Sequence, residues 1–553
     1  MTLRLFVLSL FVIALLGCQQ SDVQVRPSYY GTLEPMASEN VYFLMTDRFV
    51  DGDPDNNFPE QGGMYPTWQG KLEAEDGSKA YVGYLGGDFK GILKNASYLR
   101  ELGFSAIWLT PIVEQPDQAF TGGEQIEFGG KFKDGGKSGY HGYWGVNFYE
   151  LDEHLPSKDL DFGGLVSALE EEHQIKTVLD VVMNHGSPSF TMSVDQPMYG
   201  EIYDQDGRLI ADHMNLPPEE LDPNNPLHDM FNTKKDIMQL SDMNETNPKV
   251  MDYFVGAYSH WLDQGAHALR IDTIKHMPVE FWQEFAKRIR EHKPDIFMFA
   301  EAFQYDAEFI AKYTLEENGR ISVLDFPQQA ALLKVFETDD GNYADLLPVL
   351  HLTEGPYENP YDLMTFYDNH DMARINTDTN GYINVHNWLF TSRGIPVVYY
   401  GSEIGYMTGA AEHAGGRNYY GQRRINEAPK SVIYQGLQQI AEKRLAHVAL
   451  QRGLQLNLDF TKDTASFLRI YEHEGDNETL LVLLNKSDKA KTIRLSDYLS
   501  KGEWTESFSG QKKLIAGMEH AFQVAPNSVQ LWVLQQANTN QTLLRELDWQ
   551  MAR

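Results

Sequence analysis

The 553-residue chain has a single cysteine, Cys18, and far fewer basic than acidic side chains. One cysteine excludes an internal disulfide and a zinc site built on cysteine thiolates. The 46 basic and 79 acidic residues give a net charge of −33, which repels phosphate backbones, so we expect no nucleic-acid partner. No Gly-rich phosphate loop follows the first apolar run, which disfavours a nucleotide-binding open sheet.

The N-terminus combines Arg4, an apolar run over Leu5–Leu16 and then Gly17 and Cys18. The run is too short to span a bilayer but suits the hydrophobic region of a signal peptide. The residues LLGC, which end at Cys18, resemble the cleavage box of bacterial lipoproteins. An ordinary cleaved signal peptide is the alternative.

This resemblance implies a signal peptide over residues 1–17, a lipid on Cys18 and a polar tether over residues 18–39. The lipid bilayer of a bacterial cell envelope is then a partner. Gln19 and Gln20 follow the cysteine where an Asp would resemble an inner-membrane retention signal. We therefore expect the outer membrane if the cell has one. The oligomeric state stays open.

Beyond residue 40, apolar strand-like runs alternate with amphipathic helix-like segments, and the chain is long enough for two or three domains. Eight such runs predict an α/β fold with a closed parallel (β/α)8 TIM barrel, with an open doubly wound sheet as the rival. The strand-like runs are residues 41–49, 105–111, 177–184, 267–272, 296–303, 321–326, 364–371 and 395–400. The helix-like segments include residues 89–102, 165–173, 248–264 and 278–292.

The predicted domains follow from changes in this pattern. The barrel occupies residues 40–444 and includes an inserted subdomain after its third strand, residues 186–243, which are rich in Pro, Asp and Asn. Short alternating runs then predict an antiparallel β-sandwich domain over residues 445–536. Its expected strands are 466–472, 479–484, 492–495 and 528–534. The tail, residues 537–553, is polar and carries no clear signal.

Polar residues at the carboxyl ends of barrel strands face the active site of such a fold. Arg270 and Asp272 lie two residues apart on one expected strand, so their side chains point to the same side. A cation beside a carboxylate keeps the carboxylate ionised, as a nucleophile requires. A structural ion pair is the alternative. The strand ends also carry Asp180, Asn184, His185, Glu301, Asp368, Asn369, His370 and Asp371.

Four blocks on these strand ends resemble, in order, the signature blocks of the α-amylase family of glycoside hydrolases. They are DVVMNH (180–185), LRIDTIKH (269–276), FAEAF (299–303) and FYDNHD (366–371). Five further blocks extend the resemblance across residues 41–405: TDRFVDGDPDNN (46–57), YLGGDFKGI (84–92), HGYWGVNF (141–148), LSDMN (240–244) and IPVVYYGSE (395–403). One block alone is weak evidence, whereas nine in sequence are specific.

The resemblance implies that Asp272 is the nucleophile and that Glu301 is first the general acid and then the base. Asp371 would bind sugar hydroxyls and strengthen its hold as the ring distorts. A nucleophile and an acid about 5–5.5 Å apart give retention of configuration through a covalent glycosyl-enzyme. The apolar neighbours of Glu301, Ala300 and Phe303, favour its protonated form.

The substrate implied by the resemblance is an α-1,4-glucan such as starch, glycogen or a maltooligosaccharide. Tyr143 would stack on the sugar at the cleavage position, with a core tyrosine as the alternative. The remaining implied substrate-binding residues are His185, Arg270, Lys275, His276, Phe303 and His370. The pair Lys275-His276 and the block LSDMN resemble members that act on α-1,4 bonds rather than on branch points.

Two departures favour hydrolysis over cyclisation. Met238 stands where cyclodextrin-forming members carry an aromatic ring, and the chain ends soon after the first β domain, without their further starch-binding domains. Ala266-His267-Ala268 and Ala300 also depart from the common pattern but remove no catalytic group. A 4-α-glucanotransferase or cyclodextrin-active enzyme remains an alternative. A non-catalytic glycan-binding lipoprotein is a further alternative, although all three carboxylates argue against it.

Calcium is the implied metal, because the resemblance includes two sets of hard oxygen ligands. A turn that binds no metal is the alternative for the first set. The ions would hold the shape of the cleft without taking part in the chemistry. The first set is Asp51, Asp53, Asn56, Asn57, Asp88 and the Gly86 carbonyl, and the second is Asn184, Asp242 and the His276 carbonyl.

Overall fold

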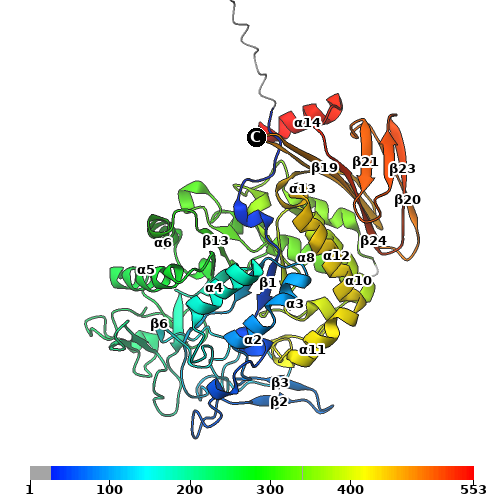
Figure 1. Cartoon of the computed structure of the whole chain (residues 1–553). Helices are drawn as coiled ribbons and strands as arrows, with labels where there is room; N and C mark the ends of the chain where they lie inside the picture. The colour runs from blue at the N-terminus through cyan, green and yellow to red at the C-terminus, as the bar shows by residue number, and fades with distance from the viewer. Residues whose placement is uncertain (1–26, 339, 553) are drawn as a thin grey trace, which may run out of the picture.

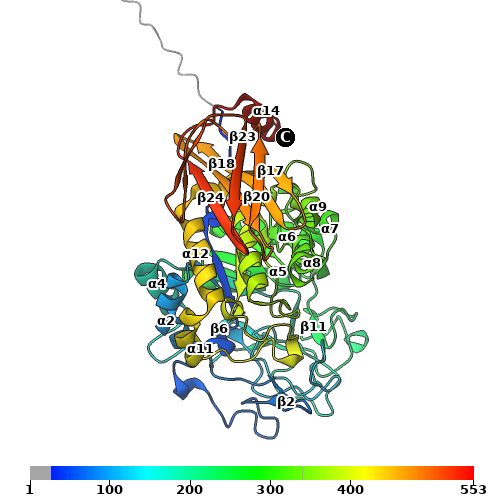
Figure 2. The same cartoon turned by 90° about the vertical axis from the view of Figure 1, so that its right-hand side faces the viewer.

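The computed structural model describes residues 27–338 and 340–552. Cys18 and the expected signal peptide therefore lie outside the described residues. Figures 1 and 2 show a barrel surrounded by helices, with a separate β domain packed at one end. Within the described part of the chain, no helix is both long and apolar enough to cross a membrane.

The barrel is a ring of eight parallel strands in the order β14-β13-β12-β7-β4-β1-β16-β15. A parallel bridge between Leu324 and Met364 joins the two ends of this order and closes the ring. The (β/α)8 prediction is therefore confirmed and the open sheet is excluded. The strands are β1 (Val41–Leu44), β4 (Ala106–Leu109), β7 (Lys176–Val181), β12 (Ala268–Ile271), β13 (Phe297–Ala300), β14 (Ser322–Val323), β15 (Met364–Thr365) and β16 (Ile395–Tyr399).

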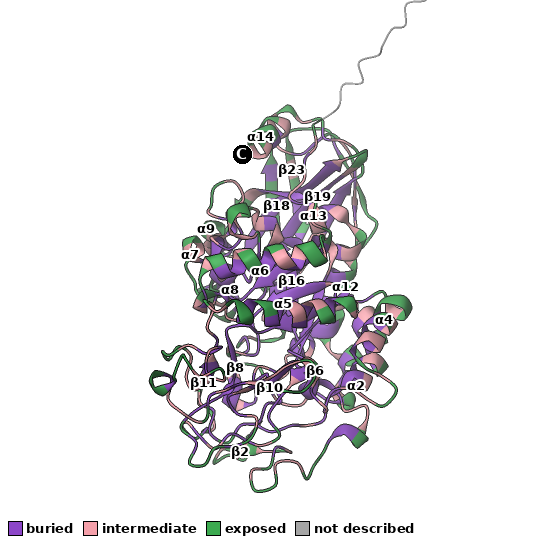
Figure 3. Ribbon diagram, turned by 90° about the vertical axis from the view of Figure 1, so that its left-hand side faces the viewer, coloured by how far each residue is buried: buried purple, intermediate pink, exposed green. Residues whose placement is uncertain are grey.

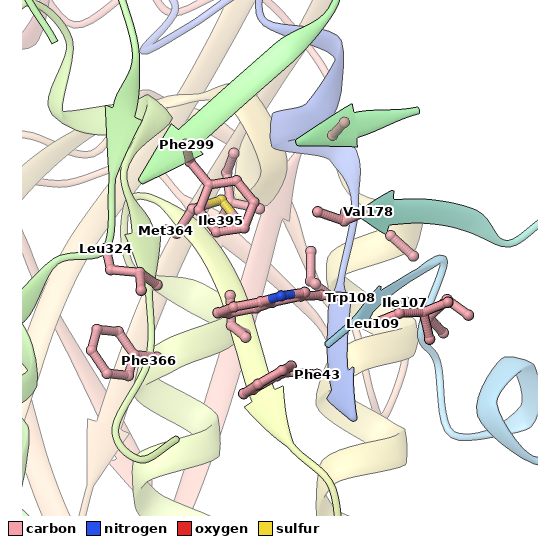
Figure 4. Close-up of a cluster of buried hydrophobic side chains, with 14 of the residues drawn as sticks. Phe43, Ile107, Trp108, Leu109, Val178, Phe299, Leu324, Met364, Phe366 and Ile395 are labelled. Atoms are coloured by element: carbon pink, nitrogen blue, oxygen red, sulfur yellow. The ribbon is translucent and has the colours of Figure 1, made fainter. Parts of the chain in front are cut away.

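Each strand is shorter than the apolar run that predicted it, because the polar end of the run leaves the sheet. Large side chains fill the barrel interior, as Figure 4 shows. Trp108 is fully buried and stacks on Phe43 with 3.9 Å between ring centroids, while Phe299 packs edge-on at 5.4 Å. This packed centre fixes the height at which each strand ends, and so positions the residues that follow.

The helices pack around the barrel, and Figure 3 shows α5 and α6 with exposed outer faces over buried strands. The predicted segment 89–102 forms two helices rather than one, because the chain breaks at Asn95 between α2 and α3. The helices of the barrel region are α1 (Thr46–Phe49), α2 (Phe89–Lys94), α3 (Ala96–Glu101), α4 (Phe162–His173), α5 (Pro248–Asp263), α6 (Val279–His292), α7 (Ala307–Ala311), α8 (Phe326–Glu337), α9 (Leu347–Leu350), α10 (Thr379–Thr391), α11 (Gln422–Glu427), α12 (Val432–Ala446) and α13 (Val448–Arg452).

Loops at the carboxyl end of the barrel contain four small antiparallel pairs that the sequence analysis did not predict. The excursion after β7 holds two of them, β8–β11 and β9–β10. The strands are β2 (Lys71–Glu73), β3 (Lys79–Tyr81), β5 (Val113–Glu114), β6 (Asn147–Leu151), β8 (His185–Pro188), β9 (Glu201–Tyr203), β10 (Leu209–Asp212) and β11 (Leu240–Asp242). A buried cluster of Phe120, Trp144, Met192 and Tyr199 joins the loop before β6 to this excursion.

The C-terminal domain has a six-stranded antiparallel sheet, β17-β18-β19-β24-β21-β22, and a two-stranded pair, β20-β23. Four of these strands match predicted runs, whereas β17, β21, β22 and β23 were not predicted. The strands are β17 (Leu454–Phe460), β18 (Thr464–His473), β19 (Asp476–Asn485), β20 (Lys491–Ser496), β21 (Gly502–Glu506), β22 (Lys512–Ile515), β23 (Glu519–Val524) and β24 (Ser528–Leu534). The polar tail forms α14 (Gln541–Met551), whose Leu543 and Leu547 are fully buried in the core of this domain.

Candidate active site

A cavity of about 330 Å³ lies at the carboxyl ends of the barrel strands, and Asp272, Glu301 and Asp371 all line it. Asp272 directly follows β12, and Glu301 directly follows β13. These two strands pair over four residues, from Ala268 opposite Phe297 to Ile271 opposite Ala300. The two carboxylates therefore leave neighbouring strands at the same height.

Arg270 is fully buried behind the cavity, where three carboxylates surround its guanidinium. Its Nη1 lies 2.7 Å from Asp272 Oδ1 and 2.8 Å from Asp180 Oδ1, and its Nη2 lies 2.8 Å from Glu301 Oε2. Asp272 and Glu301 thus sit within the span of one guanidinium group. The guanidinium therefore compensates the charge of carboxylates that would otherwise be buried without a partner.

Asp180 connects this cluster to the packed barrel interior. Its Oδ2 accepts hydrogen bonds from Trp108 Nε1 at 3.0 Å and from the Tyr143 hydroxyl at 2.8 Å. Burial raises the pKa of Asp180 to about 7, although Arg270 opposes this shift. The hydroxyl contact also fixes the ring of Tyr143, which lines the cavity rather than the core.

The surroundings of Glu301 favour its protonated form. Burial raises its pKa well above the ordinary value, and the carboxylates of Asp371, Asp272 and Asp180 raise it further against the opposing effect of Arg270. Within the described part of the chain, Oε1 of Glu301 has no hydrogen-bond partner. A buried, protonated carboxyl group with a free oxygen suits a general acid.

Asp371 is braced by Arg417, a residue that the sequence analysis did not identify. Arg417 Nη2 lies 2.7 Å from Asp371 Oδ1, and Arg417 Nε donates to the His370 carbonyl oxygen at 2.9 Å. His370 Nε2 lies 3.2 Å from Asp371 Oδ2. Burial raises the pKa of Asp371, and Arg417 opposes that shift.

Arg417 belongs to a buried ion-pair network that joins two loops. Its Nη1 lies 3.0 Å from Glu412 Oε1, and Lys137 Nζ lies 3.2 Å from the same oxygen and 3.2 Å from Asp134 Oδ1. Lys137 and Arg417 hold the pKa of Glu412 well below its ordinary value despite burial. No local sequence pattern marks this network, because its members come from segments 275 residues apart.

Tyr143 and several histidines lie close to the three carboxylates. The rings of Tyr143 and His370 are nearly parallel, with centroids 5.2 Å apart. Burial lowers the pKa of His370 and of His185, so both rings are neutral near pH 7. His141, which was not assigned a role from the sequence, lines the cavity and accepts a hydrogen bond from the Tyr143 amide at 3.1 Å.

The other predicted substrate-binding residues divide into two groups. Lys275, His276 and Phe303 line the cavity on a second wall, where Lys275 Nζ donates to the Phe303 carbonyl oxygen at 2.9 Å. His276 Nδ1 lies 2.8 Å from Asp236 Oδ2 of the excursion. Arg270 and His185, in contrast, are not among the residues that line the cavity, and lie behind those that do.

The first predicted calcium set forms one compact loop cluster. Asp88 accepts hydrogen bonds from three backbone amides, those of Gly52, Asp53 and Gly91. Burial raises the pKa of Asp88 to about 6, and Asp51 raises it further. A ligand cation would stabilise the ionised form of such a carboxylate.

The remaining members of this set fit a cation with one exception. Among the described residues, the buried Oδ1 atoms of Asn56 and Asn57 have no hydrogen-bond partner. Gly86 has φ of +88°, and a Cβ there would lie 2.3 Å from Asn57 Oδ1, so the close approach requires glycine. Asp53 is the exception, because its Oδ2 forms an ion pair with Lys90 Nζ at 2.9 Å.

The second predicted calcium set lies where the excursion meets the barrel. The Met243 amide donates to the Asn184 carbonyl at 2.9 Å, and Asp242 pairs with His185 across β8 and β11. In the described part of the chain, neither side-chain polar atom of buried Asn184 has a partner. Burial raises the pKa of Asp242 to about 7. These oxygen donors also fit a hard cation.

Comparisons with known proteins agree with this geometry. The family model for the alpha amylase catalytic domain matches residues 43–431. The cyclomaltodextrin glucanotransferase of Bacillus sp. (strain 38-2) is 30% identical over 525 residues, covering 90% of this chain and 67% of the relative. The enzyme of that name from Thermoanaerobacterium thermosulfurigenes is 28% identical, covering 86% and 63%. The chain thus spans about two thirds of the length of these relatives.

Solved structures give the same result. An Anoxybacillus alpha-amylase is 27% identical with a TM-score of 0.69, and the match covers 91% of this chain and 99% of that one. A cyclomaltodextrin glucanotransferase with a three-domain ABC distribution is also 27% identical, with a TM-score of 0.71. That match covers 90% of this chain and 99% of the other, so the similarity includes the β domain.

We predict that Arg417→Ala lowers kcat/KM on maltoheptaose by on the order of 10- to 100-fold, because it releases Asp371 and the His370 carbonyl together. Arg417→Lys keeps the positive charge but lacks the several N–H donors of a guanidinium, and should recover part of the lost kcat/KM. Steady-state kinetics measure both variants. Arg424→Ala is the control, because Arg424 donates to the carbonyl oxygens of Tyr419 and Tyr420 and lies over the Tyr406 ring. Parent-like kinetics in Arg417→Ala would contradict the role of the brace.

Proposed function

The chain belongs to the alpha-amylase family of glycoside hydrolases, and from this membership we propose that it hydrolyses α-1,4-glucosidic bonds in starch, glycogen or maltooligosaccharides with retention of configuration. One observation supports the proposal above the others. Asp272 and Glu301 leave adjacent strands and contact the same buried guanidinium, in a cavity that Asp371 also lines. This arrangement supports Asp272 as the nucleophile and Glu301, whose pKa is raised by burial, as the acid.

The proposed reaction has two steps. Asp272 attacks the anomeric carbon while Glu301 gives its proton to the leaving glycosidic oxygen, which forms a covalent glycosyl-enzyme and leaves Glu301 ionised. Glu301 then takes a proton from water, and the resulting hydroxide displaces Asp272 from the anomeric carbon. Both groups therefore return to their starting states, and two inversions give net retention.

Transfer to a sugar acceptor is the second candidate, because the curated relatives named above are cyclomaltodextrin glucanotransferases. The two activities share the covalent intermediate and differ in whether water or a sugar hydroxyl resolves it. Met238 supports hydrolysis, because it lines the cavity where cyclodextrin-forming members present an aromatic ring. A binding protein without catalysis is a weaker candidate, since Asp272, Glu301 and Asp371 all line one cavity.

We predict that Asp272→Asn lowers kcat on maltoheptaose by about 10³-fold or more while maltooligosaccharide binding persists. Glu301→Gln should lose natural-substrate activity but keep far more activity on α-maltosyl fluoride, whose leaving group needs no proton. Added azide should then yield the α-configured maltosyl azide. Glu308→Gln, an exposed glutamate on α7, is the matched control.

Product analysis of the parent enzyme separates the candidates. Glucose, maltose and other shortened oligomers, released first as α-anomers, would support retaining hydrolysis. Longer oligomers or rings as main products would instead support transfer. Full activity in Asp272→Asn, or inverted products, would refute the proposed mechanism.

We propose that Ca²⁺ occupies both oxygen-rich sets and stabilises the loops around the cavity. The first set would use Asp51, Asn56, Asn57, Asp88 and the Gly86 carbonyl, with Asp53 if Lys90 moves aside. The second would use Asn184, Asp242 and the His276 carbonyl. The unpartnered asparagine oxygens support both assignments.

Removal of calcium with EGTA should lower the Tm, since Ca²⁺ at 100 times its Kd contributes about 2.7 kcal/mol to the folded state. Asn57→Ala should reduce the Tm difference between calcium-loaded and chelated protein. Asp55→Ala alters an exposed side chain of the same loop and should leave that difference unchanged. Calorimetry measures the shifts, and equal Tm values with and without EGTA in the parent would contradict the assignment.

We also propose that the enzyme is a lipoprotein anchored through Cys18 in the bacterial cell envelope, in the outer membrane if the cell is Gram-negative. The first described residues support an outward-facing cleft. The Tyr29 amide donates to the Glu472 carbonyl at 2.8 Å and its hydroxyl donates to Asp548 at 2.7 Å, which ties this segment to the β domain. In Figure 3, α14 lies at the top of the molecule, whereas β8, which begins at His185, lies in the lower half.

Cys18→Ser should therefore shift the full-length protein from the membrane fraction to the soluble fraction and abolish labelling with an alkyne fatty acid. Ser21→Ala, a nearby change outside the cleavage box, serves as the control. Density-gradient separation of inner and outer membranes locates the parent protein. Labelling that persists in Cys18→Ser would reject the anchor.

A further inference from the structure

The arm formed by residues 120–137 extends from the barrel to the cavity and is not part of the assigned catalytic machinery. Backbone hydrogen bonds link its two halves: the Phe120 amide donates to the Lys137 carbonyl at 2.9 Å, and the Gly136 amide donates to the Phe120 carbonyl at 2.8 Å. At its base, Phe120 is fully buried and packs against Tyr199 at 5.1 Å. The arm is therefore anchored at its base.

The far end of the arm is also held in place. The Gly129 amide donates to the His413 carbonyl at 2.7 Å, and Lys133 Nζ lies 3.3 Å from Glu124 Oε2. The Gly129 contact and the ion pair between Lys137 and Glu412 attach the arm to the segment that carries Arg417, whereas the Lys133–Glu124 pair lies within the arm. An arm fixed at both ends can present a side chain with little loss of conformational entropy on binding.

Phe132 is the aromatic residue that this arm exposes at the cavity. Its exposed fraction is 61%, although it lines the same cavity as Asp272, Glu301 and Asp371. Its φ of +53° lies in the left-handed region, which disfavours residues with a side chain. Strained backbone of this kind is characteristic of ligand-contacting positions, where the surrounding structure maintains it.

The contacts of the arm place Phe132 on the Asp371 side of the cavity. Arg417 joins Asp371 to Glu412, and Glu412 is bound by Lys137 of the arm. The opposite wall, in contrast, consists of Lys275, Phe303 and Met238, which come from the segments after β12 and β13 and from the excursion. Phe303 follows Glu301 by two residues, and Glu301 would protonate the leaving oxygen, so this opposite wall faces the leaving group. The arm therefore belongs to the wall that would hold the non-reducing part of the glucan.

We propose that Phe132 is a stacking platform for a glucosyl unit of an α-glucan, beyond the unit attached to Asp272, on the non-reducing side. The C–H face of a glucosyl ring is apolar, and covering it with an exposed aromatic ring removes apolar surface of both from water. This inference rests on the proposed function and adds a specificity determinant to it.

The experiment varies the number of glucosyl units on one side of the bond while keeping the leaving group constant. α-Glucosyl fluoride has one unit on the non-reducing side and cannot reach Phe132, whereas α-maltotriosyl fluoride has three. For Phe132→Ala, we expect kcat/KM to fall about 3- to 10-fold with the maltotriosyl donor and to stay unchanged with the glucosyl donor. Phe132→Trp should retain the parent preference.

Two controls separate stacking from backbone effects. Phe132→Gly removes the ring and relieves the left-handed strain, and should show the same selective loss as Phe132→Ala. Phe508→Ala removes a partly exposed phenylalanine of the β domain and should change neither substrate. Equal Tm values for the variants confirm that the fold is intact.

An equal change with both fluorides, or no change with either, would overturn the role of Phe132 while leaving the proposed function in place. A parent enzyme that cleaves neither fluoride nor maltoheptaose would instead overturn the proposed function and the platform together. Loss with the maltotriosyl donor alone supports both.

Discussion

The buried guanidinium of Arg270 is the interaction on which the site depends. A fully buried cation is stable only if its charge is compensated, and here Asp180, Asp272 and Glu301 surround it. One positive charge cannot keep three buried carboxylates ionised, so the group least well hydrogen-bonded takes up a proton. Glu301 is that group, since its pKa is raised well above normal and its Oε1 has no partner in the described part of the chain. Burial and the neighbouring carboxylates thus favour the protonated form of Glu301, and the shared cation opposes them.

The barrel core controls this cluster through Trp108. The indole fills the barrel interior and also donates to Asp180, which in turn binds Arg270 and the Tyr143 hydroxyl. Packing of the core is therefore coupled to the position of the charged groups and of the ring that faces the substrate. Loops add the remaining parts, since Lys137, Glu412 and Arg417 reach the site from outside the strands. The barrel strands thus position Asp272 and Glu301, whereas loops held by ion pairs form the sides of the cavity.

The sequence predicted the barrel well because each strand is a fully buried apolar run that ends in polar residues. It predicted the β domain less well, since β21 and β22 are short and partly exposed and lack a clear alternation. α14 was missed because only Leu543 and Leu547 of its polar sequence are buried. The catalytic carboxylates could be placed from strand ends, but the Arg417 brace could not, because its partners are joined only by the tertiary fold. The Asp53–Lys90 ion pair was missed for the same reason.

The closure of the barrel has a consequence for how the three carboxylates are held. β12 and β13 share four paired residues, whereas β13 and β14 share two and a single bridge joins the ring between β14 and β15. Glu301 and Asp371 therefore lie on opposite sides of the most weakly paired strands of the barrel, whereas Asp272 and Glu301 follow two strands that share four paired residues. If the pairing between β14 and β15 loosens, Asp272 and Glu301 keep their spacing, and only Asp371 changes its position. The ion pair between Arg417 and Asp371 compensates for the weak backbone pairing between β14 and β15.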